Sequence, residues 1–210
     1  MIGDPRWLDD LCQEVARQVL ASAPDFITVD SADGGTGAAP MSLLDYVGLP
    51  LQESLPLVVD KRIEYGLRER IRVIASGKLI NPGEVAWALC VGADFVNSAR
   101  GFLFAIGCVQ SMQCDKNTCP AGITTHNPHL QRGLDPEDKA ERVRHYVENL
   151  RYEVEMIAHA CGATTPRQLR REHCRIVVGP GRSVPLNELY QRDAAPDHDS
   201  NAATIAQPVG

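Results

Sequence analysis

The sequence predicts an α/β fold built from strand–loop–helix units that follow one another along the chain. Three short apolar segments, 25–30, 71–75 and 93–97, each end in a loop of small residues and give way to helical sequence. Such a series is typical of a parallel sheet whose strands are connected by helices. The second observation is composition: 210 residues, 44% hydrophobic and 23% charged, suit one globular domain with a sizeable core.

An amphipathic helix at 5–21 precedes the first unit. Leu8, Leu11 and Val15 recur at helical spacing, with acidic residues between them. Segment 25–30 is short, apolar and β-branched, which indicates a buried strand, and it runs into a glycine-rich loop. A helix is expected from 56 to 66.

The second and third units repeat this order. Strand 71–75 leads through the loop 76–78 to a helix at 82–91, whose small residues permit close packing on a sheet. Strand 93–97 ends in the loop 98–101. We then expect a cysteine-bearing loop at 107–127, a long helix at 136–160 and a short helix starting within 165–169.

Charge and hydropathy exclude several partners. The net charge of -6 and the pI of about 5.5 offer no broad attraction for nucleic acid or an anionic membrane. No run approaches the roughly 20 apolar residues of a membrane-spanning helix, and the first residues lack the layout of a secretory signal. We therefore expect a cytoplasmic protein with no nucleic-acid or membrane partner. No nucleophile–base pair or paired carboxylates suggest hydrolysis.

The cysteines point to a metal centre. Seven is an odd number, and three of them, Cys108, Cys114 and Cys119, lie in one short loop. That distribution favours reduced thiols or a metal over disulfides. Thiolates are soft ligands that can converge on iron or zinc. A proline directly after a cysteine, as at Cys119, is common in iron–sulfur loops. Zinc would need a fourth ligand, which His126 or His129 could supply.

The loops after the strands could hold a phosphate. In parallel sheets covered by helices, ligands gather at the carboxyl ends of the strands, where backbone N–H groups point outward. Lys78 and Arg100 follow the second and third strands, where a cation could meet a phosphate. Taken singly, each glycine could serve only to form a tight turn, and each cationic residue could be a solvated surface residue. Three such loops in successive units favour a ligand that they share. The glycines concerned are Gly34, Gly35, Gly37 and Gly77.

These features in this order resemble a known family. Segments 26–40, with its Asp-Gly-Gly-Thr-Gly-Ala loop, 75–78 and the three-cysteine loop resemble the FMN-binding domain of glutamate synthase. The likeness is greatest to the stand-alone FMN-binding glutamate synthase family proteins, in which 97–102 and 138–143 also recur. It runs from about residue 2 to residue 178.

The resemblance implies that the chain is the C-terminal part of a (β/α)8 TIM barrel: three βα units followed by a cysteine loop and helices. Such a barrel holds FMN at the carboxyl ends of its strands and a [3Fe-4S] cluster in the loop after the last strand. The implied cluster ligands are Cys108, Cys114 and Cys119. The implied FMN-binding residues are Ser76, Gly77, Lys78, Ser98, Ala99 and Arg100 at the phosphate, and Gly34, Gly35, Thr36 and Gly37 facing the flavin and substrate.

Two segments follow from this assignment. Residues 1–178 would form the partial FMN-binding barrel, with the iron–sulfur loop at 108–119. Residues 179–210 would form an extended, disordered tail, because the stretch from about Asp193 is rich in Ala, Pro, Asp and Asn with almost nothing to bury.

The implied activity is that of an oxidoreductase. An external electron donor would reduce FMN through the cluster, and the flavin would drive formation of glutamate from 2-oxoglutarate and ammonia or glutamine-derived nitrogen. Two alternatives stay open: a non-catalytic remnant or cluster-binding module without FMN or a substrate site, and a structural zinc site.

The chain departs from the family pattern in two ways. A barrel needs eight strands and about 250 residues, whereas three strands precede the cluster loop here. An open sheet exposes two unpaired edges and an apolar face, so we expect a separately encoded N-terminal half, self-association or poor stability. Secondly, the expected phosphate loops differ in sequence. Glutamate synthases proper have Asp-Gly-Gly and Gly-Thr there, whereas this chain has Ala-Ser-Gly at 75–77 and Ser-Ala-Arg at 98–100, a difference that the stand-alone relatives share.

Overall fold

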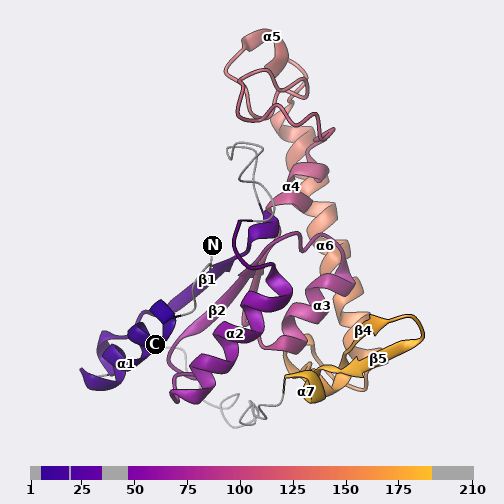
Figure 1. Cartoon of the computed structure of the whole chain (residues 1–210). Helices are drawn as coiled ribbons and strands as arrows, with labels where there is room; N and C mark the ends of the chain where they lie inside the picture. The colour runs from indigo at the N-terminus through magenta and orange to yellow at the C-terminus, as the bar shows by residue number, and fades with distance from the viewer. Residues whose placement is uncertain (1–5, 19, 35–46, 191–210) are drawn as a thin grey trace, which may run out of the picture.

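A three-stranded parallel sheet lies at the centre of the fold (Figure 1). The computed structural model describes residues 6–18, 20–34 and 47–190. The strands are β1 (Phe26–Asp30), β2 (Arg72–Ser76) and β3 (Phe95–Asn97), in the order β1-β2-β3. The predicted α/β class with a parallel sheet is confirmed.

Helices cover one face of this sheet. The side chains on that face point towards the helices and are buried, as for Val29, Val73 and Ala75. They meet α2 (Leu51–Glu64) and α3 (Pro82–Val91), while α1 (Arg6–Arg17) packs against α2. Because side chains alternate along a strand, the residues between them must point the other way.

The other face of the sheet carries exposed aromatic side chains in the part of the chain that the structure describes. Phe26 is 58% exposed and Phe95 is 51% exposed, on the two outer strands. The register places Thr28, Ile74 and Phe95 in one row across this face. Within the described residues, the outer edges of β1 and β3 pair with no further strand. Without the undescribed residues, the sheet therefore presents the open face and the two unpaired edges that were expected from its three strands.

Two helices have the bounds that the sequence predicts, because their ends carry strong local signals. Asn81 caps α3: its side chain accepts from the N–H of Glu84, whose carboxylate accepts in return from the N–H of Asn81. Asp135 caps α6 (Pro136–Ala160) in a similar way. Both helices begin with proline, which is pre-organised for the first turn.

Helix α2 begins at Leu51, earlier than the predicted start at residue 56. Pro56 lies inside the helix and has no N–H to donate to the carbonyl of Gln52. The hydroxyl of Tyr190 donates to that carbonyl at 3.0 Å. A residue 138 positions away thus supplies the hydrogen bond that proline removes.

The segment after β3 is helical where a loop was expected. It forms α4 (Ala99–Ala105), and α6 packs along both α3 and α4. The loop 106–127 and α5 (Pro128–Gln131) project beyond the body at one end of α6 (Figure 1). No helix within the described residues is long and apolar enough to cross a membrane.

Short 3-10 turns complete the fold. They are η1 (Leu20–Ser22), η2 (Ala32–Gly34), η4 (Pro166–Gln168) and η5 (Arg171–His173). The turn η4 lies where the short helix within 165–169 was expected.

The extended tail predicted for 179–210 is wrong for its first part. Strands β4 (Arg175–Gly179) and β5 (Arg182–Pro185) form an antiparallel hairpin that continues into α7 (Leu186–Leu189). Leu186 is fully buried in the core, so this segment gains hydrophobic burial that its composition did not reveal. The stretch from Asp193 lies outside the described residues.

Candidate functional site

The carboxyl ends of the three strands form one edge with matched polar residues. Asp30, Ser76 and Asn97 lie side by side in the register. Ser76 donates its hydroxyl hydrogen to Asp30 at 3.0 Å. The parallel sheet thus brings the three loops that follow these residues to the same edge, as a shared ligand would require.

The loops after β1 and β2 are packed against each other. A Cβ on Gly77 would collide with the hydroxyl of Ser31, and Gly77 has φ +152°, so only glycine fits there. The carboxylate of Asp33 accepts a hydrogen bond from the N–H of Leu51, at the start of α2, at 2.8 Å. The N–H of Asp33 donates to the hydroxyl of Ser31. Lys78 adopts φ 48°, in the left-handed region. The first of the predicted glycines, Gly34, ends η2, whereas Gly35, Thr36 and Gly37 lie outside the described residues.

The loops after β2 and β3 are joined by hydroxyl groups. Ser98 is buried and donates to the carbonyl of Leu79. Its oxygen also lies 3.1 Å from the hydroxyl of Tyr146, which in turn donates to the carbonyl of Ile80 at 2.7 Å. The hydroxyl hydrogen of Ser98 is therefore used within the protein. A phosphate at this edge would be contacted chiefly by backbone N–H groups.

Tyr146 is a site residue that the sequence did not reveal. It comes from α6 and packs edge-on against Phe102, with ring centroids 5.9 Å apart. Gly101 lies beneath it, where any Cβ would collide with the tyrosine hydroxyl. Ala99 and Arg100 form the first turn of α4 beside this contact. No local pattern marks a tyrosine in a long amphipathic helix as a loop anchor, so only the tertiary structure identifies it.

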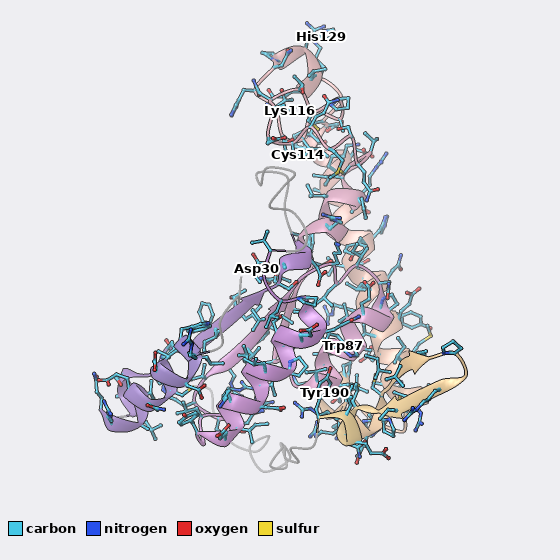
Figure 2. The ribbon with its side chains drawn as sticks, viewed as in Figure 1. Asp30, Trp87, Cys114, Lys116, His129 and Tyr190 are labelled. Carbon is cyan, nitrogen blue, oxygen red and sulfur yellow. The ribbon has the colours of Figure 1, made fainter. Side chains whose placement is uncertain are left out.

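The cysteine loop lies beyond this edge, at the projecting end of α6 (Figure 2). Cys119 is buried, whereas Cys108 and Cys114 are partly exposed. Gln110, Met112 and Asn117 have positive φ, an unusual density of left-handed residues. The side chain of Asn117 accepts from the N–H of His126, and its carbonyl accepts from Thr125 at 2.7 Å. These bonds hold the second half of the loop in a fixed turn.

The surroundings of Cys119 suit a thiolate ligand. Burial alone would raise its pKa, but hydrogen bonds from the N–H groups of Thr124, Ile123 and Ala121 outweigh this effect and lower the pKa. A sulfur surrounded by N–H donors favours the deprotonated form that binds iron.

The full ligand set is not assembled. Among residues 6–18, 20–34 and 47–190, no three His, Cys, Asp or Glu side chains lie close enough together to hold a metal ion. This applies to Cys108, Cys114 and Cys119, and equally to His126 and His129, the suggested zinc ligands, which are exposed. The donor chemistry around Cys119 fits a cluster, which would need the three thiols closer together than they lie in the described part of the chain.

The fold and site define a class: an α/β protein with closely packed loops of small residues at the carboxyl ends of a parallel sheet and a cysteine loop beyond them. A family model described as the conserved region in glutamate synthase matches residues 10–164. The chain belongs to the glutamate synthase family.

Known relatives agree with this membership. The chain is 44% identical over 190 residues to the glutamate synthase large subunit-like protein YerD of Bacillus subtilis, covering 90% of this chain and 36% of that protein. It is 34% identical over 174 residues to the archaeal glutamate synthase [NADPH] of Methanocaldococcus jannaschii, covering 83% of this chain and 33% of that protein. The chain thus spans about a third of the length of these curated relatives.

A solved structure of a flavocytochrome b2 mutant with benzoylformate is similar at 20% identity, covering 97% of this chain and 44% of that one. Its TM-score of 0.41 is too low to define the fold.

Proposed function

We propose that the chain is the electron-relay part of a glutamate synthase-type oxidoreductase, the C-terminal part of a (β/α)8 barrel. The observation that carries this proposal is the family match over 10–164, which includes both the sheet edge and the cysteine loop. The cysteine loop also lies towards the end of the sheet where the strands have their carboxyl ends (Figure 1).

FMN would lie at the carboxyl edge of β1, β2 and β3, with its phosphate near Gly77, Lys78 and the first turn of α4. Gly77 supports this assignment because its missing side chain lets the backbone come close to a neighbour. Tyr146 and Ser98 would fix the spacing between the two phosphate loops. Cys108, Cys114 and Cys119 would hold a [3Fe-4S] cluster, with Cys119 already surrounded by N–H donors.

When bound, the cluster supplies one-electron transfer and FMN supplies the two-electron reduction that converts 2-oxoglutarate and ammonia or glutamine-derived nitrogen to glutamate. The residues of this chain would orient the flavin and fix the cluster. An external donor is required, and the similarity to the archaeal glutamate synthase [NADPH] favours NADPH. We also propose a cytoplasmic location.

The remaining strands of the barrel would cover the open face of the sheet. Phe26 and Phe95 are too exposed for a finished core, and a parallel strand could pair with the free edge of β3. A separate N-terminal half or a second copy of this chain would supply this surface.

Anaerobic purification, followed by absorbance and by iron, sulfide and flavin analysis, tests the assignment. We expect iron and sulfide in the ratio of a [3Fe-4S] cluster, with bound FMN. The Cys114→Ser variant should lose the iron, whereas Cys161→Ser, a cysteine outside the loop, should keep it. Iron without flavin would favour the alternative of a cluster-binding module, and zinc would favour a structural site. Unchanged iron in Cys114→Ser would refute the ligand assignment.

A further inference from the structure

A cavity lies at the opposite end of the sheet from the proposed flavin site. Its volume is about 670 Å³, within the usual range for small-molecule sites. Arg72 begins β2 and Asp94 precedes β3, so both mark the amino-terminal end of the strands. In Figure 1 this region lies where α3 meets the lower end of α6 and the β4–β5 hairpin, away from the cysteine loop.

Arginine dominates the lining of this cavity. The lining holds five guanidinium groups and two carboxylates, those of Asp94 and Glu172. Two carboxylates outside the lining also pair with it: Asp60 with Arg171, and Glu69 with Arg72 at 3.9 Å. The whole chain has a net charge of -6, so this concentration runs against its overall balance. The arginines are Arg68, Arg72, Arg167, Arg170 and Arg171.

The carboxylate of Asp94 is already saturated by protein donors. Arg68 donates to it at 2.9 Å and Arg72 at 3.4 Å. Arg62, which lies outside the lining, and the N–H of Val73 donate to its other oxygen, each at 2.8 Å. The charge of Asp94 is therefore shared by three guanidinium groups, of which Arg72 also pairs with Glu69 at 3.9 Å, so Arg68 is only partly neutralised towards the cavity.

The opposite wall contributes arginines with no acidic partner. Within the described part of the chain, Arg167 and Arg170 form no ion pair with a carboxylate. Arg170 donates to the carbonyls of Arg167 and Leu169, which are neutral, at 2.9 and 3.0 Å. Arg167 lies over the exposed ring of Phe95, 6.0 Å from its centroid. Both groups keep further N–H donors and a full positive charge.

The cavity walls are held in place before any ligand arrives. Arg68 is fixed by Asp94, and Arg171 is fixed by Asp60 at 2.5 Å and by the carbonyl of Tyr190 at 3.2 Å. Pre-organised guanidinium groups match carboxylate and phosphate oxygens with paired hydrogen bonds.

We propose that this arginine cavity binds a small polyanion carrying at least two phosphate or carboxylate groups. Two groups are proposed because arginines line the cavity from two segments of the chain. Those at the β2–β3 end of the sheet share the charge of Asp94, and those of the η4–η5 segment include Arg167 and Arg170. The site lies at the end of the strands away from the cofactor edge, so its occupant is a second ligand and not the flavin.

Calorimetric titration of the full chain tests this proposal, with pyrophosphate and citrate as probes at constant ionic strength. We expect saturable binding of at least one probe, and the arm that binds identifies the phosphate or the carboxylate class. The Arg167→Gln/Arg170→Gln variant should weaken that binding by about tenfold or more, because it removes charge-assisted hydrogen bonds. The control Arg142→Gln/Arg151→Gln removes the same charge from the exposed surface of α6 and should bind within about twofold of the parent.

The single variant Arg167→Gln replaces an exposed side chain and gives an independent measurement should the double variant unfold; it should weaken binding at least threefold. Absence of saturable binding for both probes would overturn the proposal. Equal binding by the parent and the cavity variants would overturn it too, since the ions would then associate with the general surface.

Discussion

Replacement of Tyr146 by phenylalanine tests whether one hydroxyl joins the two proposed phosphate loops. The change removes the hydrogen bond to the carbonyl of Ile80 at 2.7 Å and the contact with Ser98 at 3.1 Å, while the ring can still pack on Phe102. The hydrogen of Ser98 is already donated to Leu79, so the change removes one hydrogen bond, which contributes about 0.5–1.5 kcal/mol, and the carbonyl of Ile80 is left without that donor, which adds a desolvation cost. We therefore expect the free energy of unfolding to fall by about 2 kcal/mol.

Urea unfolding gives this value, and hydrogen exchange locates it. The amides of 77–80 and 98–102 should exchange faster in Tyr146→Phe, because the loops are no longer joined, and FMN affinity should fall with them. Tyr152→Phe is the matched control: Tyr152 lies on the same helix, is 62% exposed and should give a change under about 0.5 kcal/mol. Equal stability of the two variants, with unchanged exchange in both loops, would refute the anchoring role.

Three further predictions concern buried charge, thiol chemistry and backbone space. Asp94→Asn should destabilise the fold by about 3–5 kcal/mol because Arg62, 2% exposed, loses its counter-charge, and urea unfolding measures this. Burial would raise the pKa of Asp94, but its hydrogen bonds from arginine and backbone N–H lower it overall, so the stabilisation holds at neutral pH. It should be lost as pH falls below 3.8, the ordinary value, through the folded-state pKa, which pH-dependent unfolding would follow. The thiol of Cys90 donates to Cys174 and lowers the pKa of Cys174 to about 7, so alkylation of Cys174, followed by peptide mass spectrometry, should reach half its maximal rate near that pH. Gly77→Ala should cost about 1–3 kcal/mol in unfolding free energy, because the added carbon has no space.

Each of these predictions has a control. Glu148→Gln removes a carboxylate from an exposed ion pair on α6 and should change stability by under about 1 kcal/mol. Gly133→Ala adds a carbon where no atom lies within 4 Å. In Cys90→Ala, the alkylation midpoint of Cys174 should move up towards the ordinary thiol range. A midpoint unchanged by that substitution, or an Asp94→Asn protein as stable as its control, would contradict the corresponding contacts.

The sequence was sufficient wherever the deciding interactions are local. Two helix starts could be predicted because each is set by capping residues next to it in the sequence: α3 by Asn81 with Glu84, and α6 by Asp135. The predicted start of α2 was wrong because Pro56 is usually a helix start, and the donor that tolerates it inside the helix comes from Tyr190. Such a compensation cannot be seen in a local window.

The hairpin β4–β5 had a sequence signal that was not used. Gly179, Pro180 and Gly181 lie between two β-branched segments, which is a turn pattern. The arginine cavity had no such signal, since its walls come from 68–72 and 167–171 and meet only in the folded chain. The roles proposed for the glycines and cysteines could be predicted from the sequence and stay predictions, whereas Tyr146 could not be found in this way.

The bond from Tyr190 to Gln52 has a consequence for biosynthesis. A ribosome makes the chain from its amino end, so α2 emerges with one carbonyl lacking a protein donor long before the residue that completes it exists. Until then only water can occupy that position, and the first turns of α2 should fray in the nascent chain. Closure of these turns would therefore have to wait until Tyr190 has been made and has left the ribosome.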